Sequence, residues 1–165
     1  MLRDKNLIPL SHQHQHALAL CVRIERASPI PGADLAAWQA EIAQIFQSEI
    51  RIHFAAEEQV LFPAARQYAE LVPLVEELLS DHAWLRAQFG RAMMTETMAA
   101  EGVRALAERL AAHIRKEERQ LFQHLQERMS VEEMTDTGRK LDEALKDSEQ
   151  ACILPTPTTR LKSAR

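Results

Sequence analysis

Two segments that lie sixty positions apart carry nearly the same pattern of residues able to bind a metal ion. Both read H-(F/I)-x-x-E-E-x-x-L-F, at residues 53–62 and 113–122. On an α-helix, residues four positions apart lie on the same face, about one turn apart. Each segment therefore presents an imidazole beside a carboxylate, His53 with Glu57 and His113 with Glu117. Two such pairs that face each other inside a helical bundle would make a metal site.

Two further histidines, His14 and His82, occupy positions where the helical pattern expects leucine, so four helices each contribute one inward imidazole. A buried carboxylate without a partner costs several kcal/mol. Two carboxylates among four imidazoles are explained if cations lie between them. The predicted metal ligands are His14, His53, Glu57, His82, His113 and Glu117, and the pattern assigns no catalytic residue.

The composition predicts the helices that must position these ligands. Ala, Leu, Glu, Gln and Arg dominate and there are only four glycines, which is typical of an all-α protein. We expect an antiparallel up-down-up-down four-helix bundle in residues 1–147, with a short fifth C-terminal helix, and a disordered tail in residues 148–165. Pro63 should kink or end the second helix, Pro73 should open the third, and the Ser130–Glu133 capping box should open the fifth.

Charge and cysteine content argue against several classes of protein. The net charge is −4 with both signs interspersed, so no nucleic-acid or membrane partner is indicated. The N-terminus shows no secretion signal, and the apolar stretches are too short to span a bilayer. The two cysteines lack CxxC spacing and suit a reducing compartment. We therefore expect a cytoplasmic protein.

The ligand-bearing stretches resemble the hemerythrin-like (HHE cation-binding) domain family, in which an antiparallel four-helix bundle holds a non-haem di-iron centre. The resemblance spans most of residues 7–129, and the two H-x-x-x-E-E-x-x-L-F blocks are its most specific part. The matching stretches are residues 10–18, 53–63, 81–86 and 113–122.

The resemblance implies two iron ions, with Glu57 and Glu117 bridging them. An oxo or hydroxo bridge would complete the centre, and open positions would bind dioxygen, peroxide or nitric oxide. Manganese or zinc are alternatives, because a mixed histidine and carboxylate site can also hold these metals. The histidines would divide between the metals, with His14 and His53 on one and His82 and His113 on the other.

The first helix offers three histidines at alternate positions, His12, His14 and His16. Successive members of this series point about 200° apart around a helix, so at most one normally faces the core. His14 shares its face with Leu10 and Cys21, and we favour it as the ligand. His16 is the alternative, and His12 is expected at the surface.

Four other polar residues are candidates for roles around the centre. Oxygen-carrying hemerythrins have a further histidine one turn after the third-helix ligand, where this chain has Arg86, so we expect a more open and asymmetric centre. They also place a carboxylate five residues after the fourth-helix histidine, which is Glu118 here. We expect Glu58 and Glu118 to be exposed or to lie behind the ligands. Glu49 would be solvated, or would accept a hydrogen bond from a ligand imidazole.

These observations support one leading function and two alternatives. The leading interpretation is a di-iron protein that binds dioxygen or a related diatomic molecule, or that senses or buffers iron and oxidants. The first alternative is a di-iron redox enzyme, an oxidase, peroxidase or nitric-oxide-processing protein, that uses an open coordination position. The second is a metal-poor helical interaction module. The sequence does not specify a protein partner.

Overall fold

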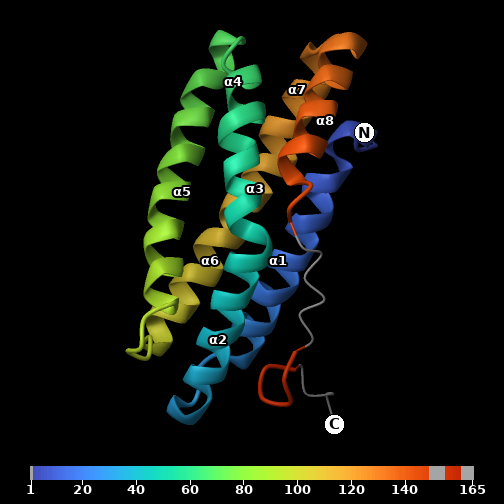
Figure 1. Cartoon of the computed structure of the whole chain (residues 1–165). Coiled ribbons are helices and arrows are strands. Elements are labelled where there is room, and N and C mark those ends of the chain that lie inside the picture. The colour runs from blue at the N-terminus through green and yellow to red at the C-terminus, as the bar shows by residue number, and fades with distance from the viewer. Residues whose placement is uncertain (1, 149–154, 161–165) are drawn as a thin grey trace.

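The computed structural model describes residues 2–148 and 155–160, and it shows four long antiparallel helical segments with a fifth helix beside them (Figure 1). The predicted bundle is confirmed, and the described residues contain no strand. Short 3-10 turns precede three of the long segments, η1 (Lys5–Leu7), η2 (Gly32–Asp34) and η5 (Ala69–Leu71). The α-helices are α1 (Ile8–Ala27), α2 (Leu35–Ile45), α3 (Arg51–Ala56), α4 (Phe62–Ala65), α5 (Val72–Ala92), α6 (Ala100–Lys116), α7 (Phe122–Arg128) and α8 (Val131–Leu145).

The second and fourth segments are each one unbroken helix that contains π turns between its α-helical parts. These turns are η3 (Phe46–Ile50) between α2 and α3, η4 (Glu57–Leu61) between α3 and α4, and η6 (Glu117–Leu121) between α6 and α7. π turns are rare and are frequently found at functional sites. Both η4 and η6 begin at the first glutamate of a repeat, so the two repeats share a local backbone as well as a sequence.

The helix signals in the sequence are mostly accurate to within a few residues. Pro73 lies in the first turn of α5, and the Ser130–Glu133 capping box opens α8 as predicted. Pro63 behaves differently, because the helix passes through it and ends two residues later, at Ala65. A proline ring normally collides with the carbonyl four residues earlier, and the wider turn of η4 lies at that position.

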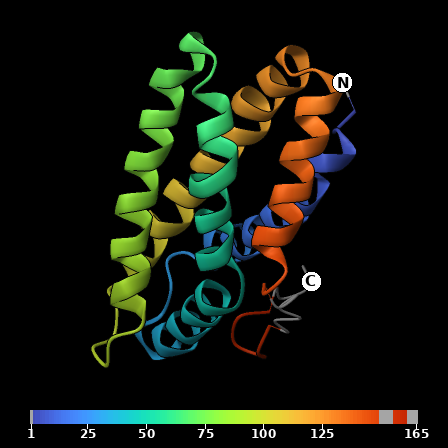
Figure 2. The ribbon, with the colours of Figure 1, turned by 45° about the horizontal axis from the view of Figure 1, so that its top comes forward.

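The apolar core is divided into two clusters, and the predicted ligands form a polar layer between them. One cluster includes Trp38, Phe89 and Leu106, and the other includes Leu78 and Phe122. Helix α8 contributes to the second cluster and packs against α3, η1 and η4. Figure 2 shows α8 beside the second helical segment. Packing on both sides therefore fixes the four segments in register around the polar layer.

The C-terminal part of the chain is described only in part. Residues 155–160 form a turn whose Thr159 carbonyl accepts a hydrogen bond from Arg23 Nη1 at 3.0 Å. Most of the tail for which disorder was predicted, residues 149–154 and 161–165, lies outside the described residues. Among the described helices, none combines the length and the apolar character needed to cross a bilayer.

Candidate metal centre

The structure brings all six predicted ligands together in the polar layer. They form two groups of four that share Glu57 and Glu117, and in each group the ligand atoms lie within 4.8 Å of one another. All six side chains are buried, and the two glutamates are 0% exposed. The groups are His14, His53, Glu57 and Glu117, and Glu57, His82, His113 and Glu117.

Each glutamate lies close to histidines from two different helices. Glu57 Oε1 is 3.1 Å from His53 Nε2, and Glu57 Oε2 is 3.3 Å from His82 Nε2. Glu117 Oε2 is 3.2 Å from both His14 Nε2 and His113 Nε2. Glu57 thus spans the two histidine pairs with its two oxygens, and Glu117 contacts one histidine from each pair. Both carboxylates therefore lie between His14 and His53 on one side and His82 and His113 on the other.

The ligand histidines are oriented by polar groups on their outer side. Three of them place Nδ1 within hydrogen-bond distance of an oxygen that can only accept, so Nδ1 carries the proton and donates it. A neutral imidazole that donates through Nδ1 has its lone pair on Nε2, which points into the centre. The bonded pairs are His14 with Glu118 at 2.7 Å, His53 with Gln13 at 2.7 Å and His82 with Glu58 at 2.8 Å.

The centre therefore contains carboxylate oxygens and imidazole Nε2 atoms that lack hydrogen-bond donors and need positive charge between them. Within the described residues, none of the four oxygens of Glu57 and Glu117 has a hydrogen-bond partner. Two pairs of Nε2 atoms also face each other, at 3.0 Å for His14 and His53 and at 3.1 Å for His82 and His113. His14 and His53 both donate through Nδ1, so as neutral imidazoles they cannot bond to each other through Nε2. Metal ions or added protons must lie between these groups, and the mixed nitrogen and oxygen donors fit transition metals better than calcium or magnesium.

The second glutamate of each repeat has a distinct place. Glu58 reaches from η4 to His82 on α5, and Glu118 reaches from η6 to His14 on α1. Glu118 also accepts a hydrogen bond from Ser11 and pairs with Arg3. Each E-E dipeptide thus supplies one glutamate to the centre and one that orients the histidine of a neighbouring helix. The two glutamates lie behind the ligands, which was one of the two placements expected for them.

Arg86 lies one turn after His82 and points away from the centre. Its Nη1 donates to Glu58 Oε1 at 2.6 Å, and its guanidinium carbon lies 5.4 Å from the centroid of the Phe54 ring. The Phe54 ring in turn stacks on His82, with 3.8 Å between the ring centroids. Arg86 therefore supports the residue that orients His82, and its position provides no ligand.

The remaining candidates from the sequence lie outside the centre. His16 is 51% exposed, and its Nδ1 is 3.0 Å from Glu49 Oε2. Glu49 is buried, so the expectation that it would be solvated is wrong. Its imidazole partner is His16, which belongs to neither group of predicted ligands. His12 is exposed, as expected.

Sequence reasoning missed two residues that contact the ligands. Gln13 accepts from His53, and Asp81 Oδ2 lies 3.5 Å from His113 Nδ1, which is too long for a good hydrogen bond. Asp81 is buried, and Arg109 and Lys116 both donate to it. In both cases the sequence feature that could have identified the residue is its position immediately before a ligand histidine. Each one, however, contacts the histidine of a different helix.

The charges of the centre alter the pKa values of its own groups. Burial lowers the pKa of His14, but the adjacent carboxylates of Glu117 and Glu118 outweigh that effect and raise it to about 9. Burial likewise opposes the charge on His113, and Glu117 and Asp81 raise its pKa to about 10. Burial raises the pKa of Glu57, yet the neighbouring His53 and His82 hold it well below its ordinary value. In the metal-free protein, the cations of the centre at neutral pH are therefore imidazolium groups.

Metal binding should consequently release protons, because an imidazole binds a metal only in its neutral form. With His14 and His113 both protonated below pH 9, about two protons should leave per chain at pH 7. The apparent association constant should then rise by up to about 100-fold per pH unit between pH 6 and 8. Zn²⁺ titrations in buffers of different ionisation enthalpy measure both quantities. An affinity that does not change across this range would contradict the assignment.

Comparison with known protein families agrees with this geometry. Residues 9–125 match the hemerythrin HHE cation binding domain, a range that contains all six predicted ligands and both repeats and leaves out α8. No curated protein and no solved structure matches the chain. The family match covers well over half of the chain. The chain therefore belongs to the hemerythrin HHE cation-binding domain family.

Proposed function

We propose that this protein is a non-haem di-iron protein that binds dioxygen or a related diatomic molecule, or that senses or buffers iron and oxidants. The observation that carries the proposal is the buried convergence of two four-residue groups that share Glu57 and Glu117. Family membership supports a cation as the occupant. Imidazole and carboxylate donors together favour iron, with manganese and zinc as the alternatives.

The ligands divide naturally between two ions. His14 and His53 would hold one ion, and His82 and His113 the other, because each pair belongs to only one of the two groups. Glu57 and Glu117 would bridge the ions and offset part of their charge. A pair of irons supplies reversible electron transfer and coordination positions for a small ligand.

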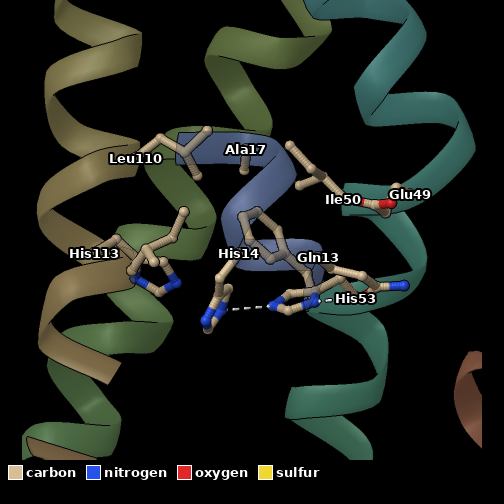
Figure 3. A pocket seen from close by; sticks show the side chains of 10 residues that line it. Gln13, His14, Ala17, Glu49, Ile50, His53, Leu110 and His113 are labelled. Atoms are coloured by element: carbon tan, nitrogen blue, oxygen red, sulfur yellow. Dashed lines mark hydrogen bonds between the residues drawn. The ribbon is translucent and has the colours of Figure 1, made fainter. Parts of the chain in front are cut away.

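A small cavity beside the centre fits the size of such a ligand. Its volume is about 10 Å³, roughly the space that one water molecule needs. Figure 3 shows Ala17, Ile50 and Leu110 around the same space as His14 and His53. Apolar walls next to metal ligands favour an uncharged molecule such as dioxygen or nitric oxide over a large or ionic substrate.

Two observations favour a redox enzyme as the second candidate. Arg86 turns toward Glu58, so the helix position one turn after His82 would supply no ligand to the second metal. The carboxylate of Glu49 also lines the cavity. An interaction module without metal is disfavoured, because buried unpaired carboxylates would then destabilise the fold.

Metal analysis of the purified protein, together with its visible spectrum with and without azide, tests the proposal. About two irons per chain and charge-transfer bands that shift with azide are expected. A stable oxygen adduct that survives repeated cycles would favour a carrier, whereas turnover of peroxide or nitric oxide would favour the enzyme. A protein that still holds no metal after anaerobic reconstitution with iron would refute the di-iron assignment.

A further inference from the structure

A second group of metal-binding side chains lies on the surface, outside the centre. A groove of about 470 Å³ is lined by His12 and His16 of α1, Asp142 of α8 and Glu49 of η3. Lys5 and Lys146 also line this groove, and the ammonium group of Lys146 pairs with Glu143. His12 and His16 are four residues apart on one helix, which places their Cβ atoms about 5–6 Å apart on one face. Two histidines with this spacing are a common chelating pair for divalent transition metals.

His16 is oriented in the same way as the buried ligands. Glu49 Oε2 lies 3.0 Å from His16 Nδ1, just as Glu118 and Glu58 contact Nδ1 of His14 and His82. Glu49 is 1% exposed, and its second oxygen has no hydrogen-bond partner within the described residues. A neutral His16 that donates to Glu49 carries its lone pair on Nε2. A carboxylate behind a histidine is the usual second partner of a metal-binding imidazole.

We propose that His12 and His16 bind a divalent transition-metal ion in this groove, with Asp142 as a third ligand and Glu49 as the positioning residue. The donor atoms of His12, His16 and Asp142 do not lie within 4.8 Å of one another in this structure, so the exposed side chains of His12 and Asp142 must turn toward His16 to complete the site. Two imidazoles and one carboxylate select ions such as Fe²⁺, Mn²⁺ or Zn²⁺ over calcium and magnesium. This surface site shares no ligand with the buried centre.

The position of the surface site suggests what it does. Gln13 and Glu49 line both this groove and the small cavity beside the buried centre. Gln13 also bonds directly to His53. The two side chains thus lie between the surface histidines and the predicted ligands. The surface site holds an ion that then passes to the buried centre, and this step alone rests on the proposed function.

Zn²⁺ stoichiometry tests the surface site. Metal-free wild-type protein should bind one more Zn²⁺ per chain than His16→Ala or His12→Ala, as measured by equilibrium dialysis. His124→Ala is the matched control, because His124 is an exposed histidine on α7 and should bind as much as wild type. The one Zn²⁺ that the variants lose is the ion of the surface site. The Zn²⁺ ions that the variants keep are those of the buried centre. Equal binding by wild type and the two variants overturns the surface site, whatever the centre does.

Glu49→Gln tests the positioning role. This substitution keeps the shape of the side chain and removes the charge behind His16, so the affinity of the surface site for Zn²⁺ should fall about tenfold. The His16→Ala background shows whether the effect acts through His16, because Glu49→Gln should then change Zn²⁺ binding no further. An unchanged affinity in the wild-type background overturns the role of Glu49.

The loading rate tests the delivery of ions. Anaerobic mixing of metal-free protein with Fe²⁺ should fill the centre about tenfold more slowly in His16→Ala than in wild type or His124→Ala, because the local concentration of cations is lost. The final iron content of the buried centre should be the same in all three proteins. Equal rates in all three proteins overturn the delivery role.

Discussion

Replacement of Glu117 by Gln should abolish binding of the metal pair. Glu117 Oε2 lies 3.2 Å from one histidine of each pair, so the substitution weakens both groups of ligands at once. It also halves the negative charge that Glu57 and Glu117 place between two divalent ions. Iron content should fall from about two per chain to near zero, a larger loss than removal of any single histidine should cause. Metal analysis after reconstitution measures this change.

The stability of the protein gives an independent measure of the same loss. A ligand at a thousand times its dissociation constant stabilises the folded state by about 4 kcal/mol. Metal ions should therefore raise the melting temperature of the wild type by more than that of Glu117→Gln. Glu108→Gln is the control, because Glu108 is exposed on the same α6–α7 segment and pairs only with Arg104 among the described residues. If Glu117→Gln keeps both irons, the assignment of Glu117 as a bridging ligand is wrong.

The sequence predicted the layer of ligands because that layer depends on helical periodicity. His53 and Glu57, like His113 and Glu117, are four residues apart, and this spacing alone places them on one face. The apolar residues around them indicated which face is inward. The choice of His14 over His12 and His16 followed from the same periodicity, and His14 is the histidine of the three that lies with the other predicted ligands.

The outer partners of the ligands could not be predicted, because they depend on contacts between helices. Glu58 bonds a histidine 24 residues away, and Glu118 bonds one 104 residues away. Helix register and rotation decide such pairs, and periodicity within one helix does not specify either. The π turns were missed for a related reason. A π turn adds one residue and shifts the apolar pattern after it by one position, and a shift of this size does not stand out within a short helical segment.

These outer partners make the two halves of the centre unequal. In the half that contains His82 and His113, His82 bonds the carboxylate of Glu58, whereas Asp81 lies 3.5 Å from His113 Nδ1, which is too long for a good hydrogen bond. In the other half, His14 faces Glu118, whereas His53 bonds the neutral amide of Gln13. A carboxylate behind an imidazole makes it a stronger donor to a metal. We therefore expect each ion to have one strongly donating imidazole, His82 in one half and His14 in the other. The halves differ in the second imidazole, because His53 Nδ1 bonds Gln13 and His113 Nδ1 has no hydrogen-bond partner within the described residues.

Glu58→Ala and Glu118→Ala should each weaken mainly one of the two ions. Loss of the carboxylate frees the ring of His82 in the first variant and that of His14 in the second. The loss of such a partner typically lowers metal affinity 10- to 100-fold. A Zn²⁺ titration should then resolve two steps, one close to the wild-type affinity and one weaker by this factor. The Gln variants should lose less, because His53 already bonds an amide in the same way.

A double-mutant comparison assigns each weakened step to its histidine. Glu118→Ala should have little further effect on Zn²⁺ affinity when His14 is already Ala, and Glu58→Ala should have little further effect when His82 is already Ala. Each crossed combination, Glu118→Ala with His82→Ala and Glu58→Ala with His14→Ala, should weaken both ions. Crossed and matched pairs that behave alike would show that the second glutamates act on the whole bundle. If the matched pairs alone are non-additive, each E-E dipeptide contributes one ligand to the centre and fixes a second ligand on a neighbouring helix.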